Sequence, residues 1–564
     1  MDILDKAKNG LPSQNGSRFF RVFPWVWLVA AYGLTMLVLC LHGRAYLDSD
    51  MSSEMVLADL LNQEGGVMST NWWYSTEIKV CSLQMFYQVG LRIFPHDWYA
   101  ARMVGQGLLM LVLLLSYLYV GHGLKLRGNG VWGAAALACP FGVWYLWYGF
   151  FGGYYVAYMI FVLLSFGAIL HLMDPAARWR RVLQWVLLVG SAGISGLNSV
   201  KGMMVFYLPM VAASLLVVWI RWHGRPQQFP RREGKLLLLS VLAFALAAAG
   251  YLVNSTVLAA THAFENFNGQ SWSAFSFEKM AEGWSLFLSL FGYPGDAFLD
   301  GVIPLLSLRG ILGAFGFLTL CAILVSLFRL LQRCGKLQDV QAVVPVLLAC
   351  ICVIQGLILS CTGTSGAEPK PMNASYWLPA VPFVFPVLQL EGETEDFRLP
   401  FARRAAALAF CLCFVATSIS ATQQFFAQNY RGNPHLEEVT DWVAQQGYTQ
   451  GYATFWNANV VTEWSSGQLE MWCVRDFNTM ITSPRLQKIS HQTPPQGALF
   501  LLTTQAELEK MGLTNLYWWS DVVYEDSKEE YQPEQRYLVM AYDSFDDMMT
   551  AVQGAQSWNN TAGA

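Results

Sequence analysis

Charged residues are scarce in this chain: Asp, Glu, Lys and Arg together make up 13% of its 564 residues. An average soluble domain carries about 25% charged residues, so the composition excludes a wholly water-soluble protein. The formal net charge of -4 is close to neutral for this length. It gives no basis for a nucleic-acid partner, because such partners call for a clustered excess of positive charge.

Metal-binding and disulfide patterns are also lacking. The chain has 11 cysteines and 8 histidines, which are scattered, and no metal-ligand spacing occurs among them. The pairs Cys350/Cys352 and Cys411/Cys413 lie inside apolar stretches, where cysteine behaves as a small hydrophobic residue. We therefore expect neither a disulfide framework nor a structural metal site.

Apolar sequence is abundant instead, since 54% of the residues are hydrophobic. About eleven stretches are long enough to cross roughly 30 Å of hydrocarbon, which predicts a polytopic α-helical membrane protein. These stretches lie near residues 23–42, 100–121, 131–149, 154–173, 182–199, 202–221, 236–258, 308–330, 342–361, 376–390 and 404–423.

The distribution of Lys and Arg predicts the sidedness of these spans. Short loops rich in Lys and Arg stay in the cytoplasm, and all such loops here fall on the side of the N-terminal segment 1–22. Loops 43–99, 259–307 and 362–375 and the C-terminal tail then lie outside. We expect a multi-pass plasma (inner) membrane protein. The basic loops are those with Lys125/Arg127, Arg178/Arg180/Arg181, Arg225/Arg231/Arg232/Lys235, Arg333/Lys336 and Arg403/Arg404.

The composition changes after residue 425 to that of a soluble domain. Alternating helical and strand patterns predict a small α/β extracytoplasmic domain over residues 426–564, after a transmembrane catalytic domain over residues 23–425. We see no nucleotide-type glycine loop in this tail, so we expect it to cover or guide rather than catalyse. The expected helices are 433–446, 505–511 and 545–552, and the expected strands are 448–454, 498–502 and 536–541.

The segment from residue 46 to residue 102, which contains the first outer loop, carries the candidate chemistry. Asp48 and Asp50 follow the first span closely, and a helical pattern begins after them, with Asp50 or Ser52 as its cap. Residues two apart do not share a helix face. We therefore expect one aspartate to point into a site and the other to cap the helix. A second surface helix is expected over residues 78–94.

Isolated cations lie on the same side of the membrane. They are Lys79, Arg102 at the start of the second span, Lys201 at the start of the sixth, and Lys370 before the tenth. Arg102 and Lys201 could simply extend towards lipid headgroups, as cations at span ends often do. An ionisable group buried at a span end is nevertheless a functional candidate. Together with the aspartates, the cations indicate a site that binds an anion and accepts a proton.

Sugar transfer from a lipid phosphate needs both functions. Fixed Lys or Arg groups stabilise the departing phosphate, and a carboxylate within reach removes the proton of the incoming hydroxyl. A polyprenyl-phosphate donor is anchored in the bilayer, which accounts for a site at the outer interface.

Several motifs in this order resemble one family. They are the acidic Asp48-Ser-Asp50 after the first span, Arg102 opening the second, Lys201-Gly202 opening a later span, and Tyr376-x-x-Pro379-x-x-Pro382. Over residues 20–425 the chain resembles the GT-C membrane glycosyltransferases, most closely the branch of protein mannosyltransferases and aminoarabinose lipid A transferases.

The resemblance implies an inverting glycosyltransferase with a polyprenyl-phosphate sugar donor. Asp50 is the better match to the family's catalytic base, and Asp48 is the alternative. Lys79 falls near the family's loop lysine. Together with the other cations on this side of the membrane, the expected phosphate ligands are Lys79, Arg102, Lys201 and Lys370. We expect the substrates to be lined by Glu54, Tyr74, Glu77, Tyr154 and Tyr376.

One departure bears on cofactors. Many relatives carry a second acid at the outer start of the fourth span, where this chain has Phe151-Gly-Gly-Tyr154-Tyr155. A divalent ion wants several oxygen ligands, so we expect no cofactor and favour a metal-independent reaction. A glycolipid, a wall polymer or a protein could each be the acceptor. A lipid-phosphate hydrolase or phosphotransferase, or a membrane transporter, remains the alternative function.

The sidedness can be tested directly. Cysteine labelling or reporter fusions should place the regions around Leu60, Met280 and Phe500 outside, and those around Arg180 and Pro230 in the cytoplasm. A cytoplasmic position for Leu60 would remove the site, because the aspartates would no longer share a face with Lys201.

Overall fold

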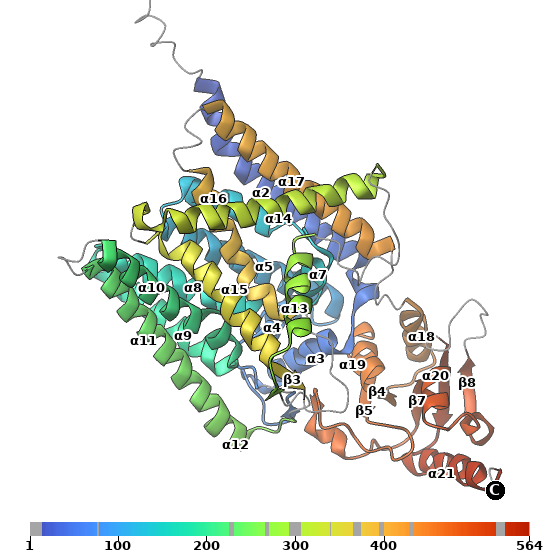
Figure 1. Ribbon diagram of the computed structural model, residues 1–564. Coiled ribbons are helices and arrows are strands. Elements are labelled where there is room, and N and C mark those ends of the chain that lie inside the picture. The colour runs from blue at the N-terminus through green and yellow to red at the C-terminus, as the bar shows by residue number, and fades with distance from the viewer. Residues whose placement is uncertain are drawn as a thin grey trace, which may run out of the picture.

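The computed structural model describes residues 14–562, except 76–77, 225–229, 266–269, 293–305, 339, 365–373, 394–399, 428–433 and 526–535. A bundle of long helices forms most of the molecule, and a smaller domain with a sheet packs against one end of it (Figure 1). The long helices are α2 (Gln14–His42), α5 (Trp98–Gly123), α8 (Val156–Met173), α9 (Arg178–Asn198), α10 (Leu208–Gly224), α11 (Arg231–Val253), α14 (Leu308–Gln332), α15 (Val343–Cys361) and α17 (Pro400–Ala427).

The prediction of a polytopic helical membrane protein is confirmed. Within the described part of the chain, eight helical segments are long and apolar enough to cross a membrane, and all eight coincide with predicted spans. The predicted span near 182–199 corresponds to α9, which packs between α8 and α11. This helix is not among the eight, because arginines and other polar residues lower its hydropathy.

Two predicted spans are broken, and prolines account for both breaks. Near 131–149 the chain forms α6 (Val131–Leu137), α7 (Val143–Tyr145) and the π-helical η3 (Leu146–Phe151), with Pro140 in the interruption. Near 376–390, a 3-10 helix η8 (Ala374–Phe383) containing Pro379 and Pro382 precedes α16 (Val384–Gly392). Proline lacks the N–H that a continuous α-helix needs.

Both surface helices expected in the first outer loop are present as α3 (Ser49–Glu64) and α4 (Leu83–Ile93). Helix α4 begins later than predicted, because the preceding residues form a loop held by side chains of Asn198 from the bundle and Gln84 from α4 itself. The remaining elements of the membrane part are η1 (Gly43–Tyr46), β1 (Trp72–Trp73), η2 (Arg127–Gly130), η4 (Met203–Tyr207), η5 (Asn254–Leu258), α12 (Ala259–Thr261), β2 (Gln270–Trp272), α13 (Phe277–Ser289), η7 (Cys334–Lys336) and β3 (Thr362–Thr364).

The C-terminal domain has the predicted α/β character. Its five-stranded sheet has the order β5-β4-β7-β9-β8, with β4 parallel to β5 and β7, and β9 antiparallel to both of its neighbours. The predicted helices and strands are all found. The elements are α18 (Pro434–Gln445), β4 (Gln450–Thr454), α19 (Phe455–Trp464), β5 (Glu470–Val474), β6 (Gln487–Lys488), η10 (Ile489–Gln492), β7 (Leu499–Thr504), α20 (Gln505–Lys510), η11 (Leu516–Trp519), β8 (Asp521–Glu525), β9 (Tyr537–Tyr542) and α21 (Phe545–Ala562).

This domain is joined closely to the first outer loop. Helix α19 packs on α3, and β6 pairs with β1 in an antiparallel ladder. Buried residues of the bundle form one continuous hydrophobic cluster with Leu436, Val439 and Phe500 of the C-terminal domain. Figure 1 shows α3 and α19 side by side where the two parts meet. The domain therefore forms part of the structure around the acidic loop.

A buried ion pair fixes this junction. Arg102 in α5 is 2% exposed, and its Nε and Nη2 lie 2.5 and 2.6 Å from the carboxylate oxygens of Glu463 in α19. Its Nη1 donates to the Tyr87 hydroxyl at 2.8 Å, and Nη2 also donates to the Met51 carbonyl at 2.9 Å. One guanidinium thus connects α5, α4, α3 and the C-terminal domain.

We expect Arg102→Ala to lower the free energy of unfolding by about 3–5 kcal/mol, because it leaves the Glu463 carboxylate buried without its partner. Arg475→Ala is the matched control. It breaks a half-exposed pair with Glu265, and exposed pairs contribute about 0–1 kcal/mol. Denaturant unfolding in detergent measures both, and equal losses would contradict a special role for the buried pair.

Candidate active site

The two aspartates take different positions at the start of α3. Asp48 is the N-cap, with extended backbone, and its Oδ1 accepts the Met51 N–H at 2.8 Å. The expectation that Asp50 or Ser52 caps this helix was wrong, because the helix begins one residue before Asp50. Asp48 also accepts a 2.8 Å hydrogen bond from the Tyr154 hydroxyl. The cap therefore restrains Asp48, and Asp50 is the aspartate with no capping role.

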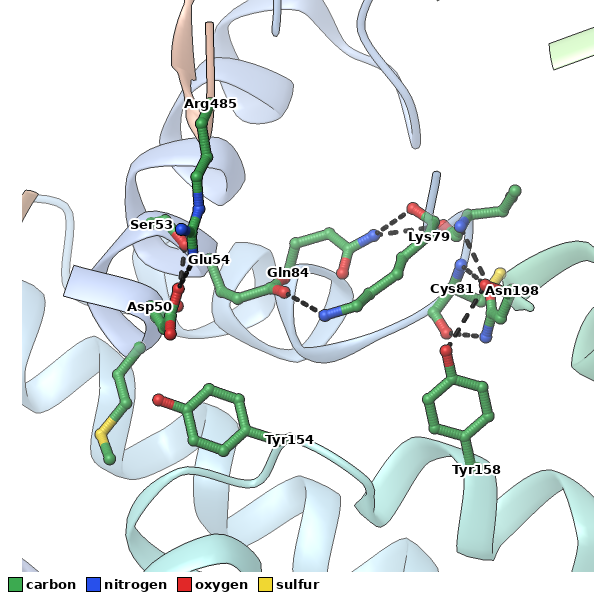
Figure 2. Close-up of polar contacts among 12 residues, drawn as sticks. Asp50, Ser53, Glu54, Lys79, Cys81, Gln84, Tyr154, Tyr158, Asn198 and Arg485 are labelled. Atoms are coloured by element: carbon green, nitrogen blue, oxygen red, sulfur yellow. Dashed lines mark hydrogen bonds and ion pairs between the residues drawn. The ribbon is translucent and has the colours of Figure 1, made fainter. Parts of the chain in front are cut away.

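Asp50 pairs with a residue from the C-terminal domain. The Nη2 atom of Arg485 lies 3.1 Å from Asp50 Oδ1, and the two side chains are 25% and 35% exposed. The carboxylate is therefore charge-compensated and still reachable from solvent. In Figure 2, the Arg485 side chain extends towards Asp50 at one side of the site.

Glu54 lies one turn further along α3 and pairs with Lys79. Lys79 Nζ is 3.1 Å from Glu54 Oε1, and Glu54 is 7% exposed. The other carboxylate oxygen, Oε2, is buried with no hydrogen-bond partner among the described residues. A buried acceptor without a partner is costly and rare in folded proteins, and it is more common at functional sites.

One side chain from the bundle and one from α4 hold the backbone of the Lys79 loop. Asn198, at the end of α9, accepts the N–H groups of Val80 and Cys81 at 3.0 and 2.9 Å and donates to the Cys81 carbonyl at 2.6 Å. Gln84 donates to the Lys79 carbonyl at 3.1 Å. In Figure 2, Lys79 reaches from this clamp towards Glu54, while Asp50 and Tyr154 lie on the opposite side. The loop therefore presents Lys79 in a defined position.

Lys201 lies three residues beyond Asn198 and contacts two aromatic rings. Its Nζ is 5.2 Å from the centroid of Tyr155 and 5.8 Å from that of Tyr376, distances typical of cation–π contacts. The rings of Tyr155 and Tyr376 meet edge to face at 6.1 Å. Asn198 thus lies between the Lys79 loop and the segment that carries Lys201.

Some expected site residues lie elsewhere. The guanidinium of Arg102 bonds to Glu463, Tyr87 and Met51. Arg102 is therefore a core residue and not the phosphate ligand that the sequence predicted. Tyr74 is 3% exposed, and its hydroxyl accepts the Ser69 N–H. Burial raises the pKa of Tyr74 to about 12. It is a neutral core residue, not an exposed lining residue. Glu77 and Lys370 lie outside the described residues.

The acidic groups do not gather into a metal-binding set. Among the described residues, no group of three or more His, Cys, Asp or Glu side chains could hold a metal ion. The neighbour of Asp48 on α8's side is the Tyr154 hydroxyl, not a carboxylate. The expectation that the reaction needs no metal ion stays a prediction.

The overall architecture was compared with known proteins. No family model matches the sequence, and no curated protein does. Among solved structures, ArnT from Cupriavidus metallidurans bound to undecaprenyl phosphate superposes with a TM-score of 0.55 at 13% identity, over 92% of this chain and 98% of that one. ArnT in the apo state gives 0.53 at 12% identity, over 93% and 98%.

The chain shares the fold of ArnT, which is a GT-C glycosyltransferase. The resemblance read from the sequence is therefore confirmed at the level of the fold. A third structure, the arabinofuranosyltransferase AftD from mycobacteria, matches at a TM-score of 0.36 and 13% identity, over 92% of this chain and 40% of that one. A score this low adds nothing to the assignment.

Arg485, Asn198 and Tyr155 contact the predicted site residues but were not predicted from the sequence. Arg485 lies 435 positions from its partner Asp50, so no local pattern could connect them. Asn198 could have been noticed, because it lies only three positions before the Lys201-Gly202 motif. Tyr155 was not chosen as a site residue from the sequence, although its ring contacts Lys201.

Proposed function

We propose that this protein is an inverting glycosyltransferase that moves a sugar from a polyprenyl-phosphate donor to an acceptor hydroxyl on the outer face of the membrane. The observation that carries the proposal is the site itself: a partly exposed carboxylate, Asp50, on the same loop as the clamped cation Lys79. The GT-C fold supports it, because ArnT, which has this fold, binds undecaprenyl phosphate.

In this proposal Asp50 is the general base. The acceptor hydroxyl attacks the anomeric carbon, and its proton passes to the Asp50 carboxylate. The bond between the anomeric carbon and the phosphate oxygen breaks, and the polyprenyl phosphate departs with the electron pair. A single displacement of this kind inverts the configuration at the anomeric carbon.

Lys201 and Lys79 are the proposed ligands of the donor phosphate. The phosphate gains negative charge as it departs, and fixed cations that are already in position stabilise it without reorganisation. The hydrogen bonds of Asn198 and Gln84 to the Lys79 loop supply that fixed position. The ring contacts of Lys201 restrict its side chain in the same way.

The proposal also covers the transferred sugar, the acceptor and the residues that line the site. The transferred sugar is a hexosyl or pentosyl group, and the acceptor is a glycolipid, a wall polymer or a protein. Glu54, Tyr154 and Tyr376 remain the proposed lining residues, since each contacts one of the charged groups of the site. The proposed location is the plasma membrane, with a cytoplasmic N-terminus and an outer C-terminal domain.

The base assignment is tested with purified protein and a radiolabelled polyprenyl-phosphate sugar. Asp50→Asn should lower the transfer rate by about 10²–10⁴-fold, the usual contribution of a general base. Asp48→Asn is the matched control, because Asn caps helices about as well as Asp, and it should cost less. Greater loss from Asp48→Asn would move the role to Asp48. Release of free labelled sugar or sugar phosphate without transfer would indicate a hydrolase or phosphotransferase.

Donor binding is a separate prediction. Lys201→Ala should weaken binding of the polyprenyl-phosphate donor about 10- to 100-fold, because a hydrogen bond to a charged group contributes about 1.5–3 kcal/mol. Lys279→Ala is the control, since Lys279 contacts the Ser273 hydroxyl and the Thr362 carbonyl and none of the site residues described above. Equilibrium binding in detergent measures both. Unchanged affinity in Lys201→Ala would leave Lys201 as a membrane anchor.

A further inference from the structure

Arg485 is the C-terminal domain's contribution to the site, and contacts on two sides fix its guanidinium. Its Nη2 lies 3.1 Å from Asp50 Oδ1, and its Cζ lies 4.2 Å from the ring centroid of Phe455, the first residue of α19. A planar guanidinium that stacks on an aromatic face while it pairs with a carboxylate is restrained in both orientation and distance. The Arg485 head group is therefore held in place.

The backbone beside Arg485 is strained. Leu486 has a φ of 49°, in the left-handed region that is unfavourable for a branched, non-glycine residue. Hydrogen bonds maintain this conformation: the Leu486 N–H donates to the Trp73 carbonyl at 2.8 Å, and the Leu486 carbonyl accepts from Asn459 at 3.0 Å. Backbone strain that the surroundings maintain is characteristic of functional sites.

The residue on the other side of Leu486 is equally fixed. Gln487 is 1% exposed, its Oε1 accepts the Cys473 N–H at 3.1 Å, and its Nε2 donates to the carbonyls of Cys473 and Ser483. Gln487 also belongs to β6, which pairs with β1 of the first outer loop. The turn that carries Arg485 is thus tied both to the sheet and to the loop that contains Asp50.

The Asp50 side chain has to be oriented by a contact other than the cap of α3. Asp48 provides the cap of α3, so the capping hydrogen bond does not orient the Asp50 side chain. A general base must lie within about 2.6–3.2 Å of the hydroxyl whose proton it accepts, and a misplacement of about 1 Å can lower a rate by about 10²-fold.

We propose that Arg485 is a positioning residue for glycosyl transfer: it holds Asp50 through Oδ1 so that Oδ2 faces the acceptor hydroxyl. The C-terminal domain then takes part in the reaction through Arg485, beyond the covering or guiding role expected from its sequence. This inference rests on the proposed function and on Asp50 as its base.

The test compares Arg485→Ala and Arg485→Lys with Arg475→Ala in steady-state transfer of labelled sugar. Arg475 is a matched control, because it also joins the C-terminal domain to the bundle, with its Nη2 2.9 and 3.0 Å from the Glu265 carboxylate oxygens. Arg485→Ala should lower kcat about 10- to 100-fold, with the KM values for donor and acceptor within about twofold. Arg485→Lys should recover part of kcat, and Arg475→Ala should leave kcat unchanged.

A second measurement separates positioning from domain docking. In the Asp50→Asn background, Arg485→Ala should cause no further loss of residual activity, because the group that it positions is already absent. Arg485→Lys serves as the folded comparison if Arg485→Ala does not fold, and a melting curve accompanies each variant.

Other outcomes would overturn the inference. Equal losses in Arg485→Ala and Arg475→Ala would reduce Arg485 to a docking contact, and a raised donor KM at constant kcat would make it a substrate ligand. Full activity of Arg485→Ala beside an inactive Asp50→Asn would overturn this inference alone. A wild-type protein without transfer activity would overturn the proposed function and the inference with it.

Discussion

The buried ion pair between Arg102 and Glu463 is the interaction on which the site geometry depends. Two charges removed from water are tolerated only where their mutual hydrogen bonds are nearly ideal, and here both carboxylate oxygens of Glu463 accept from the guanidinium. The same guanidinium donates to the Met51 carbonyl in the first turn of α3. The start of α3, which carries Asp48 and Asp50, is therefore positioned from the membrane bundle and from the C-terminal domain at once. Any displacement of α19 relative to α5 would move the aspartates as well.

Around this pair, contacts between the two parts of the chain become progressively more exposed. The Arg102 pair is buried, the Arg485–Asp50 pair is partly exposed, and the Arg475–Glu265 pair is about half exposed. Exposed pairs contribute little to stability, so the buried pair and the packing of α19 on α3 hold the parts together. The partly exposed pair is then available for a task other than stability, because its carboxylate can still meet a substrate.

The sequence was sufficient for the features that local patterns encode. Apolar stretches of the right length located the eight helical segments that qualify as spans among the described residues, and the helical pattern after Asp50 located α3. The predicted N-cap of α3 was wrong. Asp48 and Asp50 are equally good capping residues, and the sequence pattern did not fix the first residue of the helix to within two positions. Two spans were predicted as continuous, although they contain Pro140, Pro379 and Pro382, because the prediction rested on their overall apolarity. Arg485 and the engagement of Arg102 by Glu463 required the tertiary structure, since each pair is separated by more than 350 positions.

The charge balance of the site follows from one residue at the start of α8. This residue is Tyr154, whose hydroxyl donates to Asp48. A carboxylate there would have added negative charge beside Asp48 and Asp50, which a divalent ion could offset. Tyr154 adds none, and the charges already present are compensated by the chain itself: Asp50 by Arg485, and Glu54 by Lys79. In the proposed reaction, fixed side-chain cations stabilise the departing phosphate. Because Arg485 belongs to the C-terminal domain, the charge compensation of Asp50 depends on the contact between that domain and the first outer loop.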